Sequence, residues 1–150
     1  MGLEILINND IKSAMISKDK KKLAALRAIK SALLIEKTGK DSSGGEIPET
    51  VELQLLQKLV KQRRESADIY VQQNRSDLAE VEQYEADIIQ AYLPQQMDEK
   101  TLKAEIEKMI AETGASSMKD MGKVMGMASK KFAGKADNKA ISDLVKALLG

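Results

Sequence analysis

Residues 116–137 read "SSMKDMGKVMGMASKKFAGKAD", and their spacing decides how the last third of the chain folds. Apolar side chains recur three and four residues apart in this stretch, which is the period of one face of an α-helix. The same stretch contains Gly122 and Gly126, although each glycine destabilises a helix by about 1 kcal/mol relative to alanine. The sequence therefore predicts a helix that keeps two glycines for a reason other than helix stability.

A helical wheel of residues 118–133, drawn at about 100° per residue, separates three strips. The first strip is the predicted core face and consists of Met118, Met121, Met125, Ala128 and Phe132. The second strip has almost no side chain and consists of Gly122, Gly126, Ser129 and Ala133. The third strip is basic and consists of Lys119, Lys123 and Lys130. The predicted order around the helix is core, bare backbone and positive charge.

Two interpretations of the bare strip are open. In the first, small residues let a neighbouring helix cross closely, and the lysines form a solvated flank. In the second, the bare backbone admits a flat anionic ligand such as a sugar-phosphate chain, which the lysines hold as point charges. Because lysine lacks the fork with which arginine reads guanine, this surface would recognise the shape of an RNA. Lys131, Lys135 and Lys139 extend the positive area toward the last helix, whose first amides are a further candidate anion contact.

The rest of the chain also shows helical periodicity, and no run has the alternation of a β-strand, so the sequence predicts an all-α protein. Four helices are expected in the N-terminal part, with apolar stripes that begin near Leu3, after Asp19, after Pro48 and at Asn74 or Ser76. The first two should form a hairpin, with Asp19 capping the second. Residues 37–49, "KTGKDSSGGEIPE", are predicted to be the longest loop and mobile.

The stretch "YLPQQMDE" ends the fourth helix, because a residue before proline is disfavoured in helical geometry. We place a domain boundary there, with an N-terminal helical domain at 1–94 and a C-terminal domain at 95–150. Three shorter helices are expected in the second domain, at roughly 98–113, 118–132 and 138–149. Gly114 should end the first of them, Ser117 and Asp120 should form a capping box, and Asp137 should cap the last.

The chain of 150 residues contains no histidine, no cysteine and no tryptophan. This composition excludes Ser-His-Asp and Cys-His nucleophiles and zinc sites built from Cys and His. We identify no catalytic residue, no metal ligand and no cofactor site, so an independent enzyme is the least favoured class. No stretch approaches the roughly 18 apolar residues of a spanning helix, and the lack of cysteine suits a reducing compartment. A cytoplasmic protein without a membrane partner is therefore expected.

The net charge of +1 is unevenly distributed. Residues 1–94 carry −1, residues 95–114 carry −2, and residues 115–139 carry six lysines against two aspartates, which gives +4. A local basic patch on a nearly neutral protein indicates an anionic partner at one place. Six of the eight methionines lie in the C-terminal domain, which indicates either an adaptable core or a protein-binding surface. Met127 lies opposite the predicted core strip and is expected to be exposed. Arg63 and Arg64 are expected to pair with Asp68, Glu80 or Glu85, with an anion contact as the alternative.

Four stretches closely resemble the YqeY family: "KLAALRAIKSAL", "KLVKQRRESADIY", "AYLPQQM" and "IAETGASSMKDMGKVMGMASKKFAGKAD". The resemblance covers essentially the whole chain, and "TGASSMKDMGKVMG" is its most specific part. The fold of this family is similar to the C-terminal tail of the B subunit of the tRNA-dependent amidotransferase, in which the tail holds the outer part of tRNA. The resemblance implies a two-domain helical protein and places Gly122, Lys123 and Gly126, with Lys119 and Lys130 beside them, at an RNA surface.

The resemblance also links the chain to carbon-nitrogen ligase complexes that use glutamine as amido donor. The chain lacks the catalytic cradle and the amidase portion of those complexes, so no amide-forming activity follows for this polypeptide alone. The function expected from the sequence is a non-catalytic module that binds tRNA or another structured RNA near translation. The alternatives are a protein-interaction adaptor that uses the methionine-rich domain and an accessory subunit of an amidotransferase.

Overall fold

The computed structural model describes residues 2–39 and 47–150. Within these residues every regular element is an α-helix except one short 3-10 turn, so the all-α prediction is confirmed. By its internal contacts the chain forms two compact units, Met1–Leu93 (unit 1) and Pro94–Gly150 (unit 2). Each unit is described by itself below, and the independent folding of 1–94 and 95–150 as separate domains stays a prediction.

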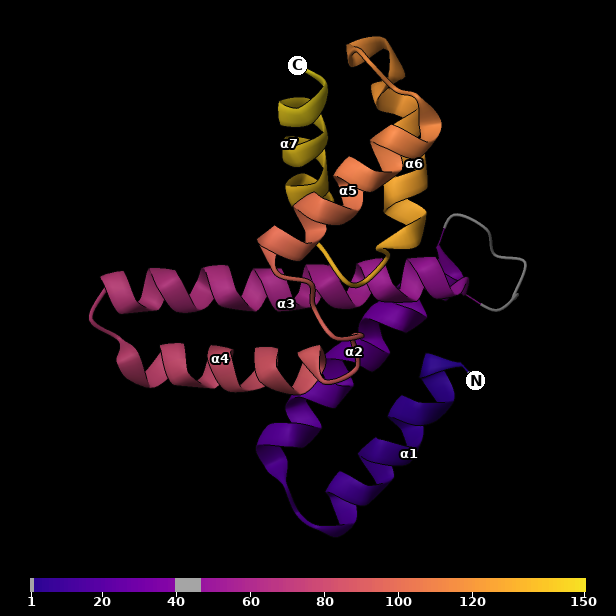
Figure 1. Cartoon of the computed structure of the whole chain (residues 1–150). Helices are drawn as coiled ribbons and strands as arrows, with labels where there is room; N and C mark the ends of the chain where they lie inside the picture. Colours follow the sequence, from indigo (N-terminus) through magenta and orange to yellow (C-terminus); the bar gives the residue numbers. More distant parts are fainter. Residues whose placement is uncertain (1, 40–46) are drawn as a thin grey trace. The chain divides into compact units, whose positions relative to one another are not determined.

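Unit 1 contains two helical hairpins (Figure 1). Its helices are α1 (Leu3–Ile16), α2 (Lys20–Thr38), α3 (Glu49–Gln72) and α4 (Ser76–Gln90). The α1–α2 hairpin packs against the α3–α4 hairpin, with α2 in contact with both helices of the second pair. The core of unit 1 is built from aliphatic side chains of all four helices, including Ile7, Leu26, Ile29, Leu56 and Ile89, all of them almost completely buried.

Local sequence signals set the helix ends of unit 1. The carboxylate of Asp19 accepts a hydrogen bond from the Lys22 amide at 3.1 Å and caps α2, as predicted. Helix α1 has no cap in its own segment, and its first amide, that of Leu3, donates to Glu52 of α3 at 3.1 Å instead. Of the loop predicted at 37–49, residues 37, 38 and 49 are helical, because α2 extends to Thr38 and α3 begins at Glu49. Residues 39, 47 and 48 are outside the helices, and residues 40–46 lie outside the described residues.

Polar side chains tie the helices of unit 1 together. The Arg64 guanidinium donates to three groups of α4, namely Gln83, Asp87 at 2.8 Å and Gln90 at 2.9 Å. Its neighbour Arg63 lies 3.5 Å from Glu85, which is one of the expected partners. The arginines therefore join α3 to α4, which agrees with the expectation that they pair within the protein and not with the alternative of an anion contact.

Tyr92 connects the end of α4 to α1, because its hydroxyl donates a hydrogen bond to the Asp10 carboxylate. Burial raises the pKa of the Tyr92 phenol well above its usual range, and the bond to Asp10 adds to the shift. The phenol therefore stays protonated in the folded protein at pH values where an exposed tyrosine ionises.

Unit 2 is a three-helix arrangement with one additional turn (Figure 1). Its elements are α5 (Glu99–Thr113), the 3-10 turn η1 (Met118–Asp120), α6 (Met121–Lys131) and α7 (Asn138–Leu149). Asp98 caps α5 by accepting from the Thr101 amide at 2.6 Å, and this bond lowers the pKa of its carboxyl group. Gly114 ends α5 in the left-handed conformation with φ of 71°, and Asp137 caps α7, as the sequence predicted.

The start of the glycine-containing helix corrects one prediction. Met118 was expected in the core, but its residue is 48% exposed. Residues 118–120 form a 3-10 turn, so the α-helical wheel does not apply to them, and α6 begins only at Met121. Val124, which was not assigned to the core strip, is fully buried together with Ala128, while Met121 and Met125 pack at the edge of the core.

Candidate nucleic-acid interface

The two glycines of α6 lie on an exposed face of the helix. A Cβ atom added to either Gly122 or Gly126 would meet no atom within 4 Å. Neither glycine has the positive φ that would require glycine for conformational reasons. Among the described residues of unit 2, no helix crosses α6 at these positions. The first interpretation of the bare strip, a close crossing by a neighbouring helix, therefore finds no such helix in this unit.

Two lysines border this bare strip. Lys123 and Lys130 are both exposed, and on a wheel of about 100° per residue they lie about 20° apart. Gly126 lies about 40° to 60° from them on the same wheel. Lys119 is also exposed, in the 3-10 turn that precedes the helix. The structure therefore brings Gly126, Lys123 and Lys130 onto adjoining strips, with Lys119 close to the beginning of the helix.

Lys131 belongs to a different flank of α6. Its ammonium group lies 3.3 Å from the Glu105 carboxylate of α5 and 5.7 Å from the centroid of the Phe132 ring. On the wheel it is about 80° from Lys123, on the side away from the glycines. The structure places this predicted site residue in contact with α5 and apart from the bare strip.

Lys135 and Lys139 lie in and after the turn that joins α6 to α7, and both are exposed. The turn is held in place by its backbone, since the carbonyl of Lys135 accepts from the Met97 amide at 2.9 Å. At the start of α7 the Asp137 carboxylate accepts from the Lys139 amide at 3.4 Å. The sequence suggested that an anion could bind the first amides of α7. In the structure the Asp137 carboxylate of the chain itself occupies that position.

The electrostatics of α6 are one-sided, because Met121–Lys131 contains three lysines and no acidic residue. The nearest acid in sequence, Asp120, accepts a hydrogen bond from the Ser116 amide at 3.1 Å. The exposed face of α6 therefore carries positive charge without an acidic side chain of its own helix to neutralise it.

The methionines of unit 2 are divided between core and surface. Met109 is buried, and Met97, Met121 and Met125 pack against the same core. Met118 and Met127 are exposed, and Met127 is the one that the sequence predicted to be so. Most methionines of unit 2 thus belong to an adaptable core, which is the first of the two predicted interpretations.

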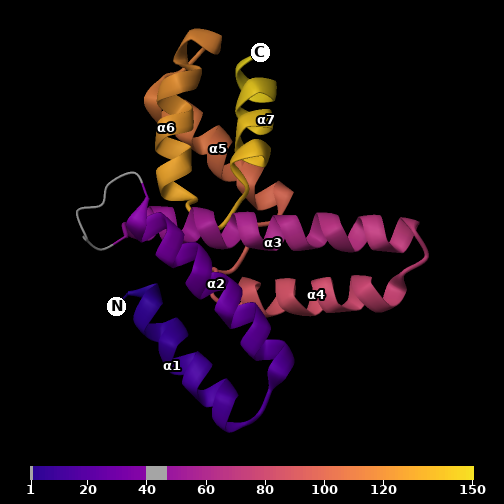
Figure 2. The same ribbon diagram turned by 180° about the vertical axis from the view of Figure 1, so that it is seen from behind.

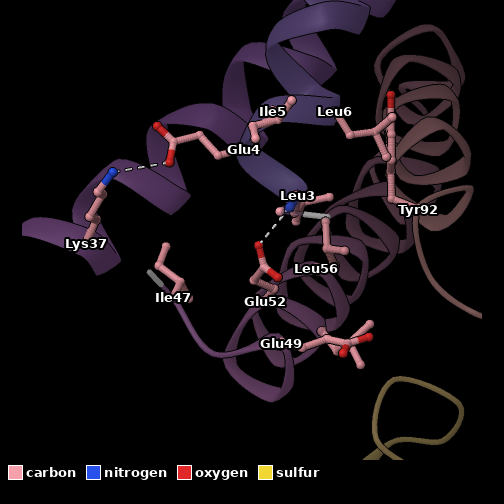
Figure 3. Close-up of a pocket in the computed structure, with 12 residues that line it drawn as sticks. Leu3, Glu4, Ile5, Leu6, Lys37, Ile47, Glu49, Glu52, Leu56 and Tyr92 are labelled. Carbon is pink, nitrogen blue, oxygen red and sulfur yellow. Dashed lines mark hydrogen bonds and ion pairs between the residues drawn. The ribbon is translucent and has the colours of Figure 1, made fainter. Parts of the chain in front are cut away.

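Each unit has a groove that is lined by described residues. The groove in unit 1 has a volume of about 460 Å³ and surrounds the start of α1 (Figure 3). Its polar groups are engaged with one another: Glu52 accepts from the Leu3 amide, and Lys37 lies 3.4 Å from Glu4. Among the described residues no group of three or more acidic side chains is arranged to hold a metal ion. Glu52, Lys37 and Glu4 of this groove are therefore already engaged with other groups of unit 1.

The groove in unit 2 has a volume of about 520 Å³ and runs between α5, α7 and the segment before α5. Its lining includes the apolar side chains of Met97, Leu102 and Leu144, and four charged residues, Glu99, Lys135, Asp137 and Asp143. It lies apart from the lysine-bordered strip of α6, because no residue of α6 lines it.

One basic surface escaped the sequence analysis. Residues 11–38 carry eight basic against two acidic side chains, a net charge of +6, which exceeds that of residues 115–139. The signal was present in the sequence but was lost because the charge was summed over residues 1–94, where the five acidic residues of α4 and the two of residues 1–10 offset it. Charge summed over single hairpins would have found it.

Among the described residues, no helix is both long enough and apolar enough to span a bilayer.

Comparison with known proteins gives two findings. The sequence profile of the family described as "Yqey-like protein" matches residues 5–149. Among curated proteins, the chain is similar to "Altered inheritance of mitochondria protein 41, mitochondrial" from three yeasts. The identity is 31% over 113 residues for Lachancea thermotolerans, 40% over 87 residues for Meyerozyma guilliermondii and 34% over 90 residues for Saccharomyces cerevisiae.

These matches cover 74%, 58% and 60% of this chain but only 59%, 44% and 48% of the three relatives, in the same order. The chain thus spans about half the length of the curated relatives that it matches. The names of the relatives place them in mitochondria, so the prediction of a cytoplasmic location is wrong. The lack of cysteine and of a long apolar stretch suits any reducing compartment, and it carried no information on which one.

Proposed function

This chain belongs to the YqeY family, and we propose that it is a non-catalytic RNA-binding protein that holds tRNA or another structured RNA on the exposed face of α6. The observation that carries the proposal is the open glycine face of this helix. Gly122 and Gly126 have free space where a side chain would stand, and Lys123 and Lys130 border them. The lysines Lys119, Lys135 and Lys139 would add contacts at the two ends of the helix.

The glycines are unexpected on stability grounds alone. An exposed helical position with room for a Cβ is more stable as alanine by about 1 kcal/mol. A ligand that must approach the helix backbone closely would explain why no side chain is present, and a sugar-phosphate backbone has the required shape and charge. Lysines at the border would then neutralise phosphates without reading bases, since each offers a compact charge and no planar fork.

The resemblance to the amidotransferase tail supports tRNA as the first ligand to test. The aromatic side chains agree with a structured rather than a single-stranded ligand. Phe132 is buried in the core of unit 2, and no other aromatic residue occurs in that unit, so no stacking platform for unpaired bases adjoins α6.

The decisive experiment is a titration of the protein with tRNA at two salt concentrations. Binding should weaken as salt rises, because lysines release counterions from phosphates. Lys123→Glu should lower the affinity at low salt by about tenfold and reduce the slope of log K against log salt by about 1. Lys108→Glu is the matched control, because it changes the same charge at an exposed position of α5 in the same unit.

The proposal fails if the unmodified protein does not bind tRNA at low salt. It also fails if Lys123→Glu and Lys108→Glu weaken binding equally, since a general charge effect would then replace a site. Lys131→Glu gives a further test of the geometry: because Lys131 pairs with Glu105 of α5, its reversal should weaken binding less than that of Lys123.

A second candidate function is a protein-interaction adaptor, and the groove of unit 2 favours it. Its lining combines apolar side chains with three acidic residues and one lysine, which suits a partner helix with apolar and basic side chains. A stoichiometric protein partner that survives nuclease and high salt in an affinity purification would support this candidate. Loss of every partner after nuclease treatment would support the RNA function instead.

A role as accessory subunit of an amidotransferase rests on the family resemblance. It predicts that adding this protein to a purified amidotransferase changes the rate of amide transfer to tRNA. An unchanged rate would remove this candidate and leave direct RNA binding unaffected.

For the location, the names of the yeast relatives support a mitochondrial protein. Imaging of the tagged protein beside a mitochondrial marker, in cells that contain mitochondria, tests this extension. A diffuse signal outside mitochondria would separate this chain from those relatives in location while leaving its family membership intact.

A further inference from the structure

The turn between α1 and α2 carries a dense group of lysines. We define the hairpin tip as residues 12–22, which comprise the end of α1, the turn and the first residues of α2. Its lysines are Lys12, Lys18, Lys20, Lys21 and Lys22, and all five are exposed. Figures 1 and 2 show this turn at an end of unit 1, away from α3.

These lysines are not neutralised by the rest of the described chain. Among the described residues, no carboxylate lies within ion-pair distance of Lys12, Lys18, Lys20 or Lys22. The one acid of the hairpin tip, Asp19, uses its carboxylate to cap α2. The tip is therefore a positive surface whose charge has no counterpart within the described part of the chain.

The same tip exposes two large apolar side chains that are not buried in the core of unit 1. Ile16 is 79% exposed, more than any other large apolar residue in the described chain, and its neighbour Met15 is 56% exposed. Burial of an isoleucine side chain stabilises a protein by about 1.5 to 3 kcal/mol, and an exposed Ile16 does not contribute this free energy to the fold. A partner that covers Ile16 and Met15 would recover this free energy.

An aromatic side chain borders the tip as well. The ammonium group of Lys21 lies 5.8 Å from the centroid of the Tyr84 ring of α4, which places this tyrosine beside the lysines. Tyr84 is itself 39% exposed. A tyrosine with one apolar and one polar end is typical of the boundary between the hydrocarbon and the headgroups of a bilayer.

We propose that the hairpin tip binds peripherally to the surface of a membrane that contains anionic lipids. Ile16 and Met15 enter the boundary between headgroups and acyl chains, and the five lysines contact the lipid phosphates around them. An RNA would satisfy the lysines but would leave the two aliphatic side chains in water, since bases stack on aromatic rings and phosphates do not bind alkyl groups. The combination of aliphatic and basic groups at one turn therefore favours the bilayer.

This surface is compatible with the lack of a spanning helix in the described residues. The expectation that no membrane takes part was based on the absence of a long apolar stretch, and that criterion detects helices that cross a bilayer. A turn that lies on the surface needs only a few apolar side chains together with charge.

The test is co-sedimentation of the whole protein with lipid vesicles. Vesicles of phosphatidylcholine with about 30% phosphatidylserine should bind the protein, and vesicles of phosphatidylcholine alone should not. Ile16→Ser should lower the partition coefficient by about tenfold. The combined change Lys20→Glu and Lys22→Glu should lower it by at least about 25-fold, since each lysine near an anionic surface contributes about fivefold.

Two matched controls accompany these variants. Ile5→Ser changes the same residue type on the same helix at another exposed position, 57% against 79% for Ile16. Ile5 lies about 16 Å along α1 from Ile16, so this variant should leave vesicle binding unchanged. The pair Lys123→Glu and Lys130→Glu makes the same charge change on α6 and should lower tRNA affinity without lowering vesicle binding. The membrane and RNA proposals can therefore fail independently.

Insertion can be observed directly because the chain contains no tryptophan. Ile16→Trp introduces a single reporter, whose fluorescence should shift to shorter wavelength when anionic vesicles are added, while Ile5→Trp should not shift. The proposal is overturned if the protein does not sediment with anionic vesicles at low salt, or if the variants at positions 16 and 5 behave alike. It is also overturned if the hairpin-tip variants lower tRNA affinity and vesicle binding is absent, because the tip is then an RNA contact.

Discussion

Unit 1 and unit 2 differ in how they use apolar side chains, although the described residues of both are helical. Unit 2 buries ten apolar residues within its 57 positions and leaves two large ones exposed, Met118 and Met127. Unit 1 buries twelve among its 85 described residues and leaves ten large ones exposed, several of them on α1 and α2. Unit 2, the smaller of the two, therefore leaves a smaller share of its large apolar side chains exposed than unit 1 does.

The polar contacts differ in the same way. In unit 1, Arg64 and Tyr92 connect helices through hydrogen bonds. In unit 2, Lys131 and Glu105 form an exposed ion pair between α6 and α5. When hydrogen bonds between side chains help to hold the helices of a unit together, more of its apolar side chains can remain exposed. The surface of unit 2 therefore carries charged side chains and few large apolar ones, whereas the surface of unit 1 carries both.

The largest expected effect comes from opening the core of one unit at a time. Ile106 of α5 and Ile29 of α2 are both fully buried, and alanine at either position should lower the unfolding free energy of its unit by about 3 kcal/mol. Ile106→Ala should have the more severe consequence, because a unit of 57 residues has less stability to lose. Hydrogen exchange of amides in each unit measures the two effects separately.

If both variants accelerate exchange equally in both units, the chain unfolds as one cooperative body. The division into two separately stable units would then be wrong, and the comparison between them would concern surfaces only. Met118→Ala is the control in unit 2, since this exposed side chain should contribute little to stability.

The next largest effect concerns the polar tie between α3 and α4. Arg64→Ala should lower the unfolding free energy of unit 1 by about 1 to 2 kcal/mol, because Gln83, Asp87 and Gln90 lose their shared donor. Arg75→Ala removes the exposed pair with Asp77 and should leave stability unchanged, since an ion pair in solvent contributes little. Urea denaturation of both variants measures the difference, and equal effects would mean that polar ties do not distinguish unit 1.

A smaller effect is expected at Tyr92 and depends on pH. Tyr92→Phe should lower the unfolding free energy by about 1 kcal/mol at neutral pH, because the hydrogen bond to Asp10 is lost. The pKa of Tyr92 is raised in the folded state, so this stabilising contribution is complete below about pH 10 and falls as the pH rises further. Above that pH the unfolded chain releases the proton and the folded chain retains it.

Denaturation measured from pH 7 to pH 11 therefore separates the two proteins. The unmodified protein should lose stability more steeply above about pH 10 than Tyr92→Phe, so the difference between them narrows. Parallel curves over this range would show that the Tyr92 hydroxyl is not protected from ionisation in unit 1.

The smallest change in stability should have the opposite sign. Gly126→Ala should raise the unfolding free energy of unit 2 by about 0.5 to 1 kcal/mol, because the new methyl group meets nothing within 4 Å. The same variant should weaken tRNA binding if the phosphate backbone approaches α6 closely. Thermal denaturation and the tRNA titration together give the test, and greater stability with unchanged tRNA affinity would show that the bare strip is not a contact surface.

Much of the fold could be predicted because its signals are local. Asp19, Gly114 and Asp137 act within a few residues of the helix ends that they determine, and the structure places them there. The exposed state of Met127 also followed from its position on the wheel. Helical periodicity and end signals depend on neighbours in sequence, so a single sequence contains them.

The errors and omissions have a different origin. Met118 was assigned to the core because the wheel assumed that the α-helix began before it, and a 3-10 turn shifts the phase at that point. Lys131 was expected to extend the positive area beside the basic strip, and its contact with Glu105 was missed because that partner is 26 residues away in the sequence. The charge of the α1–α2 hairpin was hidden by acidic residues of other helices, which fold elsewhere in unit 1.

The sequence by itself determined that the chain forms helices, where most of them begin and end, and to which family it belongs. These properties depend on residues a few positions apart or on the order of residues along the chain. Only the tertiary structure decided which helix faces are covered. An exposed Gly126, an exposed Ile16 and an Arg64 shared among three side chains of α4 each depend on what packs nearby, and that is decided by residues distant in sequence.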